Sequence, residues 1–137
     1  MPRQRIARIR GDVTADAFYF PLQVNRFIVP DMILDTGAYE LTFSGQVAQA
    51  LRLPRLGTQQ IMGVGGATSA YRSQCDLYFD TRMYRNVPCV VDPDFPGAGA
   101  GLFGLRFFVD ARLTIELNTV TETLSVFPAE EEGNASD

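Results

Sequence analysis

One aspartate stands in a setting suited to chemistry. Asp35 follows the apolar run Met32–Leu34 and is itself followed by Thr36 and Gly37. The apolar run predicts a buried strand, and Asp-Thr-Gly at its end predicts a sharp turn, because glycine permits backbone conformations that a Cβ forbids. A carboxylate held rigidly and partly desolvated at such a turn can take part in acid–base chemistry. Asp35 is therefore the first candidate for a catalytic group.

The composition narrows the choice of chemistry. The chain has no histidine, and its 12 basic residues are all arginines. The lack of histidine excludes Ser-His and Cys-His nucleophilic catalysis and argues against a zinc hydrolase site. Acid–base work would fall to carboxylates first, then to tyrosines or cysteines, and no metal or cofactor is predicted.

Length and charge limit the domains and partners that we expect. A chain of 137 residues is long enough for one domain with a real core. With a net charge of -4 and no concentration of basic residues, no nucleic-acid partner is expected. No signal peptide follows Met1, and no apolar run approaches the roughly 20 residues that span a bilayer. We therefore expect a cytoplasmic protein without a membrane partner.

The two cysteines carry little information about function. Cys75 and Cys89 lack a C-x-x-C spacing, so neither a redox motif nor a metal knuckle is indicated. Buried, reduced thiols are the favoured interpretation, although the sequence leaves open whether the two residues pair.

The elements that must position Asp35 are mostly strands. Alternating, β-branched and aromatic runs predict strands at 3–10, 17–24, 27–29, 32–34, 40–44, 58–62, 68–79, 87–92, 112–117 and 121–127. Pro30 and Asp31 predict an irregularity, Asn25-Arg26 a hairpin turn, and residues 80–86 a polar connection. Short helices are predicted at 45–51, capped by Ser44, and at 105–110. This inventory favours an all-β fold in one domain, 1–128, followed by a disordered acidic tail, 129–137.

A glycine-rich tip interrupts the longest predicted hairpin. Gly63, Gly65 and Gly66 occupy three of four successive positions. Taken alone, this stretch is most simply a plain hairpin turn. A phosphate-binding loop is disfavoured, because strand-like sequence follows and a Walker lysine is missing.

Together these motifs resemble the retroviral-type aspartic proteases and, more closely, the single-domain retropepsin-like proteases of bacteria. The resemblance covers roughly residues 17–127 and rests on motif order. The motifs are Ile33–Ala38, the glycine-rich hairpin, Gly101-Leu102-Phe103-Gly104 before a short helix, and a closing hairpin. It implies a closed β-barrel or sandwich with a glycine-rich flap hairpin and one or two short helices.

The resemblance also implies roles for individual residues. Asp35 would be the catalytic carboxylate, and Thr36 would hydrogen-bond across a two-fold axis. Gly37 would bring its carbonyl to the substrate, and Ala38 would complete the active-site loop. The flap over the substrate cleft would consist of Met62, Gly63, Val64, Gly65 and Gly66. The segment beneath the active-site loop would consist of Leu102, Phe103 and Gly104.

The mechanism implied by the resemblance needs two carboxylates that share a site, one ionised and one protonated. The chain carries a single Asp-Ser/Thr-Gly, since Asp80-Thr81 is followed by Arg82. The resemblance therefore implies a C2 homodimer with Asp35 from each subunit across the axis. Such a dimer would be an aspartic endopeptidase that acts on peptides or proteins without a cofactor.

The chain departs from the viral pattern at three positions. Tyr39 and Glu40 stand where the viral enzymes often carry acidic residues, so substrate specificity is not carried over. Arg106 stands where related proteins often carry an acidic or polar residue, so no ion pair is carried over to it either.

Two other interpretations remain open. The chain could be an inactive retropepsin-fold module that binds peptides or dimerises, since the same scaffold offers a groove for strand pairing. It could also be an unrelated β-barrel in which Asp35 only caps a turn. The presence of both Asp35 and Thr36 favours an active site over the inactive module.

Overall fold

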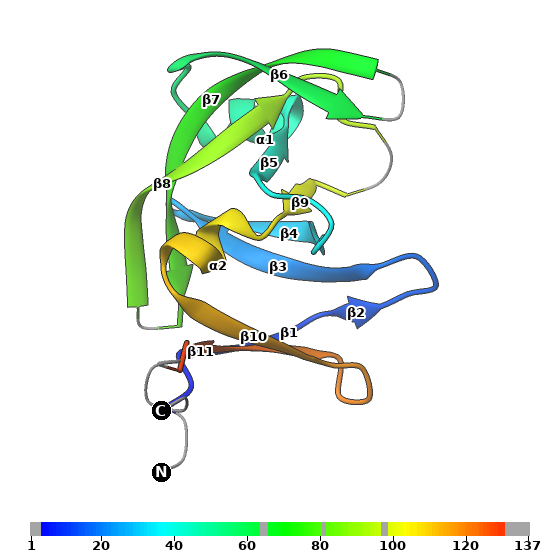
Figure 1. The fold of residues 1–137 in the computed structure, drawn as a ribbon, viewed down its shortest axis with the longest axis vertical. Helices are drawn as coiled ribbons and strands as arrows, with labels where there is room; N and C mark the ends of the chain where they lie inside the picture. Colours follow the sequence, from blue (N-terminus) through cyan, green and yellow to red (C-terminus); the bar gives the residue numbers. More distant parts are fainter. Residues whose placement is uncertain (1–3, 64–65, 81, 97–98, 131–137) are drawn as a thin grey trace, which may run out of the picture.

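The computed structural model describes residues 4–63, 66–80, 82–96 and 99–130. Within them the chain forms strands joined by short turns, with two short helices (Figure 1). The helices are α1 (Gly45–Leu51) and α2 (Arg106–Asp110). The strands are β1 (Ala7–Arg10), β2 (Asp12–Val13), β3 (Phe18–Val24), β4 (Phe27–Leu34), β5 (Leu41–Ser44), β6 (Gly57–Gly63), β7 (Gly66–Phe79), β8 (Arg82–Asp92), β9 (Gly101–Phe103), β10 (Leu113–Asn118) and β11 (Thr123–Pro128). The predicted all-β class is confirmed.

A closed ring of strands forms the centre of the molecule. In the described part of the chain its order is β3, β4, β9, β5, β8 and β7, and β7 returns to β3 through the pairs Gln23–Tyr78 and Val24–Leu77. β2 and β6 extend this sheet beyond the ring, on β3 and β7. The predicted closed barrel is therefore confirmed.

Aromatic side chains fill the space between the barrel and α2. The ring of Phe103 lies 6.0 Å from that of Phe20 and 6.4 Å from that of Phe79, measured between centroids. Phe107 of α2 packs on both Phe79 and Phe103, at 5.6 and 5.9 Å. Burial of such large apolar rings is a main source of the free energy that holds α2 against the barrel.

A second, smaller sheet lies at one end of the barrel, in the lower part of Figure 1. It consists of β1, β11 and β10 in that order, with both pairings antiparallel. Ala7, Leu124 and Val126 are buried between this sheet and the barrel. Strands from the two ends of the described chain thus pair with each other beneath the barrel.

Several local predictions are confirmed. The Ser44 hydroxyl caps α1 by accepting the N–H of Val47 at 3.2 Å. Asn25 adopts a left-handed conformation with φ of 53° in the β3–β4 turn. The β3–β4 register shifts between Phe20 and Leu22, opposite the predicted irregularity at residues 30–31.

The prediction of a polar connection over 80–86 is wrong. β8 already begins at Arg82 and pairs with the end of β7, with Tyr84 opposite Leu77. A bulge at Asn86 (φ 55°), whose N–H donates to Asp76 Oδ1 at 2.9 Å, lets the strand continue. Pairing with a long neighbouring strand thus overrides the low strand propensity of these polar residues.

Some predictions fall on residues that the structure does not describe. These are Val64 and Gly65 at the hairpin tip and residues 131–137 of the predicted tail. Among the described residues, no helix has the length and apolar character needed to cross a membrane.

Candidate active site

Asp35 lies at the carboxyl end of β4, where three strands meet. β9 lies between β4 and β5: Phe103 is the parallel partner of Leu34 and the antiparallel partner of Leu41. The backbone N–H of Asp35 donates to the carbonyl of Phe103 at 3.1 Å. The main chain of Asp35 is therefore anchored to the barrel, while its side chain is half-buried.

The loop that follows holds the Asp35 carboxylate in place. The Gly37 N–H donates to Asp35 Oδ1 at 2.9 Å, and the Ala38 N–H donates to the Asp35 carbonyl at 3.1 Å. Within the described chain, no arginine lies within ion-pairing distance of this carboxylate. Thr36 and Gly37 are exposed. The carboxylate is thus oriented by its own loop, and one of its oxygens remains available to another group.

The segment Leu102–Gly104 lies directly against this loop. The N–H of Leu105, next in the chain, donates to the carbonyl of Ala38 at 3.1 Å. A Cβ added at Gly104 would lie 2.5 Å from the carbonyl oxygen of Tyr39 and 2.6 Å from that of Glu40. Glycine is therefore required at position 104, because the two backbones approach too closely for a side chain.

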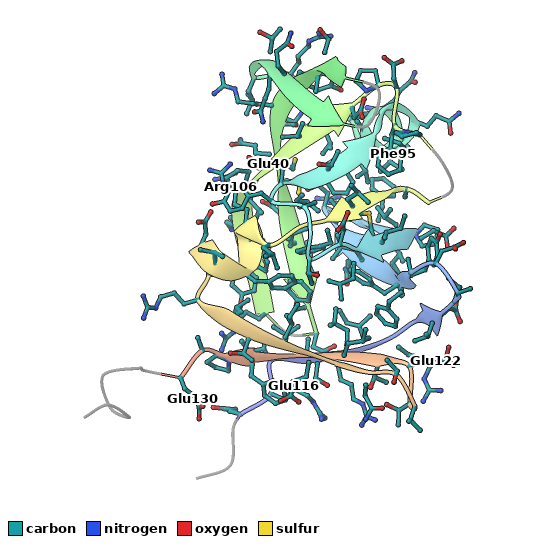
Figure 2. All side chains as sticks on the ribbon, turned by 45° about the vertical axis from the view of Figure 1, so that its right-hand side comes forward. Glu40, Phe95, Arg106, Glu116, Glu122 and Glu130 are labelled. Carbon is teal, nitrogen blue, oxygen red and sulfur yellow. The ribbon has the colours of Figure 1, made fainter. Side chains whose placement is uncertain are left out.

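An ion pair that the sequence did not predict joins the loop to α2. Arg106 Nη1 lies 3.1 Å from Glu40 Oε1, and Arg106 Nε lies 3.4 Å from Asp110 Oδ2. Figure 2 shows Glu40 and Arg106 side by side. The guanidinium also lies 6.0 Å from the centroid of the Tyr39 ring. The hydrogen bond to Glu40 raises the pKa of Arg106, and the nearby carboxylates add to this effect while burial opposes it.

We expect Arg106→Met to lower stability modestly. Removing the guanidinium leaves Glu40 without its cation, and the pair is partly exposed, with 36% and 22% of the two side chains accessible. After solvent screening, the loss should be about 1 kcal/mol, or ~4 °C in the midpoint of thermal unfolding. Arg8→Met, at an exposed arginine of β1, is the control and should change little. Equal midpoints for the two variants would contradict a stabilising role for the ion pair.

The predicted flap corresponds to the hairpin of β6 and β7. Met62 pairs with Ala67, and Gly63 pairs with Gly66. In Figure 1 this hairpin extends from the barrel at the end opposite the small sheet. No backbone hydrogen bond in the described chain joins it to the loop at Asp35. The structure therefore brings residues 35–38 and 102–104 together, whereas the hairpin makes no backbone hydrogen bond to this loop within the described chain.

The surroundings of Cys75 and Cys89 disfavour nucleophilic chemistry at either thiol. Both are free and buried, with exposed fractions of 4% and 2%. The hydrogen bond with Cys89, together with burial, raises the pKa of the Cys75 thiol well above its usual range. A thiol held in its protonated form is a poor nucleophile and a poor metal ligand. Among the described residues, no three side chains of the metal-binding types come together as a possible site.

Two hollows lie near the loop, but neither contains Asp35. One, of about 390 Å³, lies between β8 and α2. The other, of about 350 Å³, lies between β8, the base of the β6–β7 hairpin and Glu40. Asp35 therefore lines neither of these two hollows.

Comparisons with known proteins give a result only at the level of structure. No protein-family model matches the sequence, and no curated protein matches it significantly. The chain is similar to a retropepsin-like aspartic protease from Rickettsia conorii, with a TM-score of 0.62 and 15% identity over 96% of this chain and 98% of that one. It is similar to EIAV protease complexed with the inhibitor HBY-793, with a TM-score of 0.55 and 20% identity over 72% of this chain and 93% of that one. It is also similar to the retroviral protease-like domain of Ddi1 from Leishmania major, with a TM-score of 0.55 and 16% identity over 90% of this chain and 99% of that one.

Proposed function

We propose that this chain, which has the retropepsin fold, is one subunit of an aspartic endopeptidase that hydrolyses peptide bonds as a C2 homodimer. The observation that carries the proposal is the setting of Asp35. Its main chain is anchored to Phe103, its Oδ1 accepts the Gly37 N–H, and the described residues offer it no cation. Structural similarity to two proteins named as proteases supports the proposal.

The chemistry needs a second carboxylate. Two carboxylates that share a site cannot both ionise readily, so one holds a proton while the other is charged. The charged group accepts a proton from a water molecule, whose oxygen attacks the peptide carbonyl carbon, and the other carboxylic acid protonates the carbonyl oxygen. The C–N bond then breaks as the leaving nitrogen takes up a proton.

The second carboxylate would come from Asp35 of another copy of the chain. Thr36 and Gly37 are exposed beside Asp35, where a partner's loop could approach. The Thr36 hydroxyl makes no hydrogen bond within the described residues, so it retains a donor and an acceptor for such a partner. These features support a two-fold axis that passes close to Thr36 and Asp35.

The dependence of cleavage on protein concentration tests this assembly. Because each subunit supplies one carboxylate, activity per subunit should rise with concentration and level off once dimers predominate. Peptide cleavage and sedimentation should be measured over the same range of concentrations. Constant activity per subunit where the protein sediments as a monomer would refute the shared site. Peptide binding without cleavage by the dimer would instead support the inactive module.

A further inference from the structure

Two adjoining hollows lie beside α2, and Arg106 lines both of them. The hollows of about 390 and 350 Å³ share Asn86, Pro88 and Arg106 as lining residues. The two hollows adjoin at these residues, and we call them together the β8 groove. Glu40 lines one part of it and belongs to the loop that begins at Asp35. One part of the groove therefore lies against the loop that carries the candidate active site.

The floor of the groove is a strand edge that is only partly covered. β8 pairs with β7 along its length but with β5 only from Val90 to Asp92. In the described chain, residues 82–89 of β8 have no strand on their other side. Pro88 has no N–H, so this edge cannot form an uninterrupted ladder with an added strand. Side chains must therefore provide most of the recognition of a ligand in the groove.

The charges that remain free in the groove are positive. Glu40 and Asp110 are both engaged by Arg106. Arg72 and Arg85 line the two hollows, and neither has a carboxylate partner among the described residues. The groove thus carries an excess of positive charge, although the whole chain has a net charge of -4. A groove with two unpaired guanidinium groups favours an anionic ligand.

Arg72 is exposed, and its guanidinium lies against Gly57. It lies opposite Gly57 in the β6–β7 pairing, and its carbonyl accepts the N–H of Leu56 at 2.9 Å. A Cβ at Gly57 would collide with Nη2 of Arg72 and lie 3.1 Å from its Cζ. The missing side chain of Gly57 thus provides the space for the guanidinium.

We propose that the β8 groove binds an acidic segment of an extended peptide. In the active dimer this segment is the part of the substrate that continues past Glu40, beyond the scissile bond. Arg72 and Arg85 contact its carboxylates from opposite sides of Arg106. The identification of the segment as substrate rests on the proposed function, whereas the preference for acidic peptides does not.

Binding is measured first, with the Asp35→Asn variant so that the peptide is not cut. A labelled glutamate-rich peptide and the same peptide with glutamine at each glutamate are compared by fluorescence anisotropy. The acidic peptide should bind about tenfold more tightly than the glutamine peptide. The ratio of the two affinities should fall as salt is added, because salt screens the charges. Adding Arg72→Gln or Arg85→Gln should weaken its binding about fivefold each, the upper range for exposed ion pairs. Arg8→Gln, at an exposed arginine of β1, is the matched control and should leave the affinity unchanged.

Equal affinity for the two peptides, or unchanged affinity in the Arg72 and Arg85 variants, would overturn the proposal. A second measurement uses the parent protein and two substrates with the same cleavable core and either an acidic or a glutamine extension. A higher kcat/KM for the acidic substrate supports the proposal. Equal cleavage of both overturns it while leaving the peptidase function intact. Retained, arginine-dependent binding of the acidic peptide without any cleavage supports the acidic groove and refutes the peptidase function.

Discussion

Asp35→Asn is expected to reduce peptide cleavage by about a thousandfold or more, because an amide can neither take up nor release the proton that the reaction moves. Asparagine has nearly the same shape as aspartate, and its Oδ1 can still accept the Gly37 N–H that orients Asp35. The fold should therefore be unchanged. Cleavage of a peptide mixture, the midpoint of thermal unfolding and sedimentation together measure the effect.

The control for this variant is Asp31→Asn. Asp31 lies on the same strand, is exposed and makes no ion pair within the described chain, so the same chemical change should leave cleavage intact. Equal cleavage by the parent and Asp35→Asn would refute the peptidase proposal.

Mixing subunits extends the test to the shared site. When equal amounts of parent and Asp35→Asn subunits exchange freely, half of the parent subunits enter inactive mixed dimers. Activity should then fall to about half of what the parent subunits give alone. Unchanged activity in the mixture would show that each chain acts by itself.

Gly104→Ala is expected to lower stability strongly. The new Cβ would lie 2.5 Å from the carbonyl oxygen of Tyr39, which is a backbone atom and cannot rotate away. Either β9 or the active-site loop must shift, and we expect a loss of about 3 kcal/mol, or ~10 °C in the midpoint of thermal unfolding. Urea unfolding monitored by circular dichroism gives the free energy directly.

The control for this variant is Gly37→Ala. Its Cβ would meet only Asp35 Oδ1, at 3.3 Å, and the residue is exposed, so stability should change by less than about 1 kcal/mol. If the two variants were equally stable, the close packing of Gly104 against the loop would not be needed for folding.

Features that depend on neighbours in the sequence could be predicted from the sequence. Ser44 as the cap of α1 and Asn25 in the β3–β4 turn both follow from the preferences of single residues in local geometry. The irregularity at residues 30–31 follows from the missing N–H of Pro30. In each case the physical cause lies within a few residues of its effect.

Features that depend on distant partners could not be predicted in this way. The polar start of β8 is a strand because β7 lies beside it, and β1 pairs with β11 from the other end of the described chain. The ion pair of Arg106 and Glu40 has the same origin, since its members are 66 positions apart. The alternation of apolar and polar residues identifies a strand, and charge identifies a residue that can form an ion pair. Neither signal specifies which distant segment or residue is the partner.

The candidate site lies between these two cases. The turn chemistry of residues 35–37 is local and could be recognised directly. The placement of Leu102–Gly104 against it was implied only by the resemblance to a known family, because it depends on the insertion of β9 between β4 and β5. The second carboxylate stays a prediction, because it would belong to another copy of the chain.

The position of β9 has a consequence for the order in which the chain can fold. β9 lies between β4 and β5, although it follows β8 in the sequence, and its Phe103 carbonyl accepts the N–H of Asp35. Chains are synthesised from the N-terminus, and contacts between distant segments form late. A growing chain therefore exposes Asp35 long before the strand that anchors it has been made. In a peptidase, this order would delay proteolytic activity at least until β9 has left the ribosome.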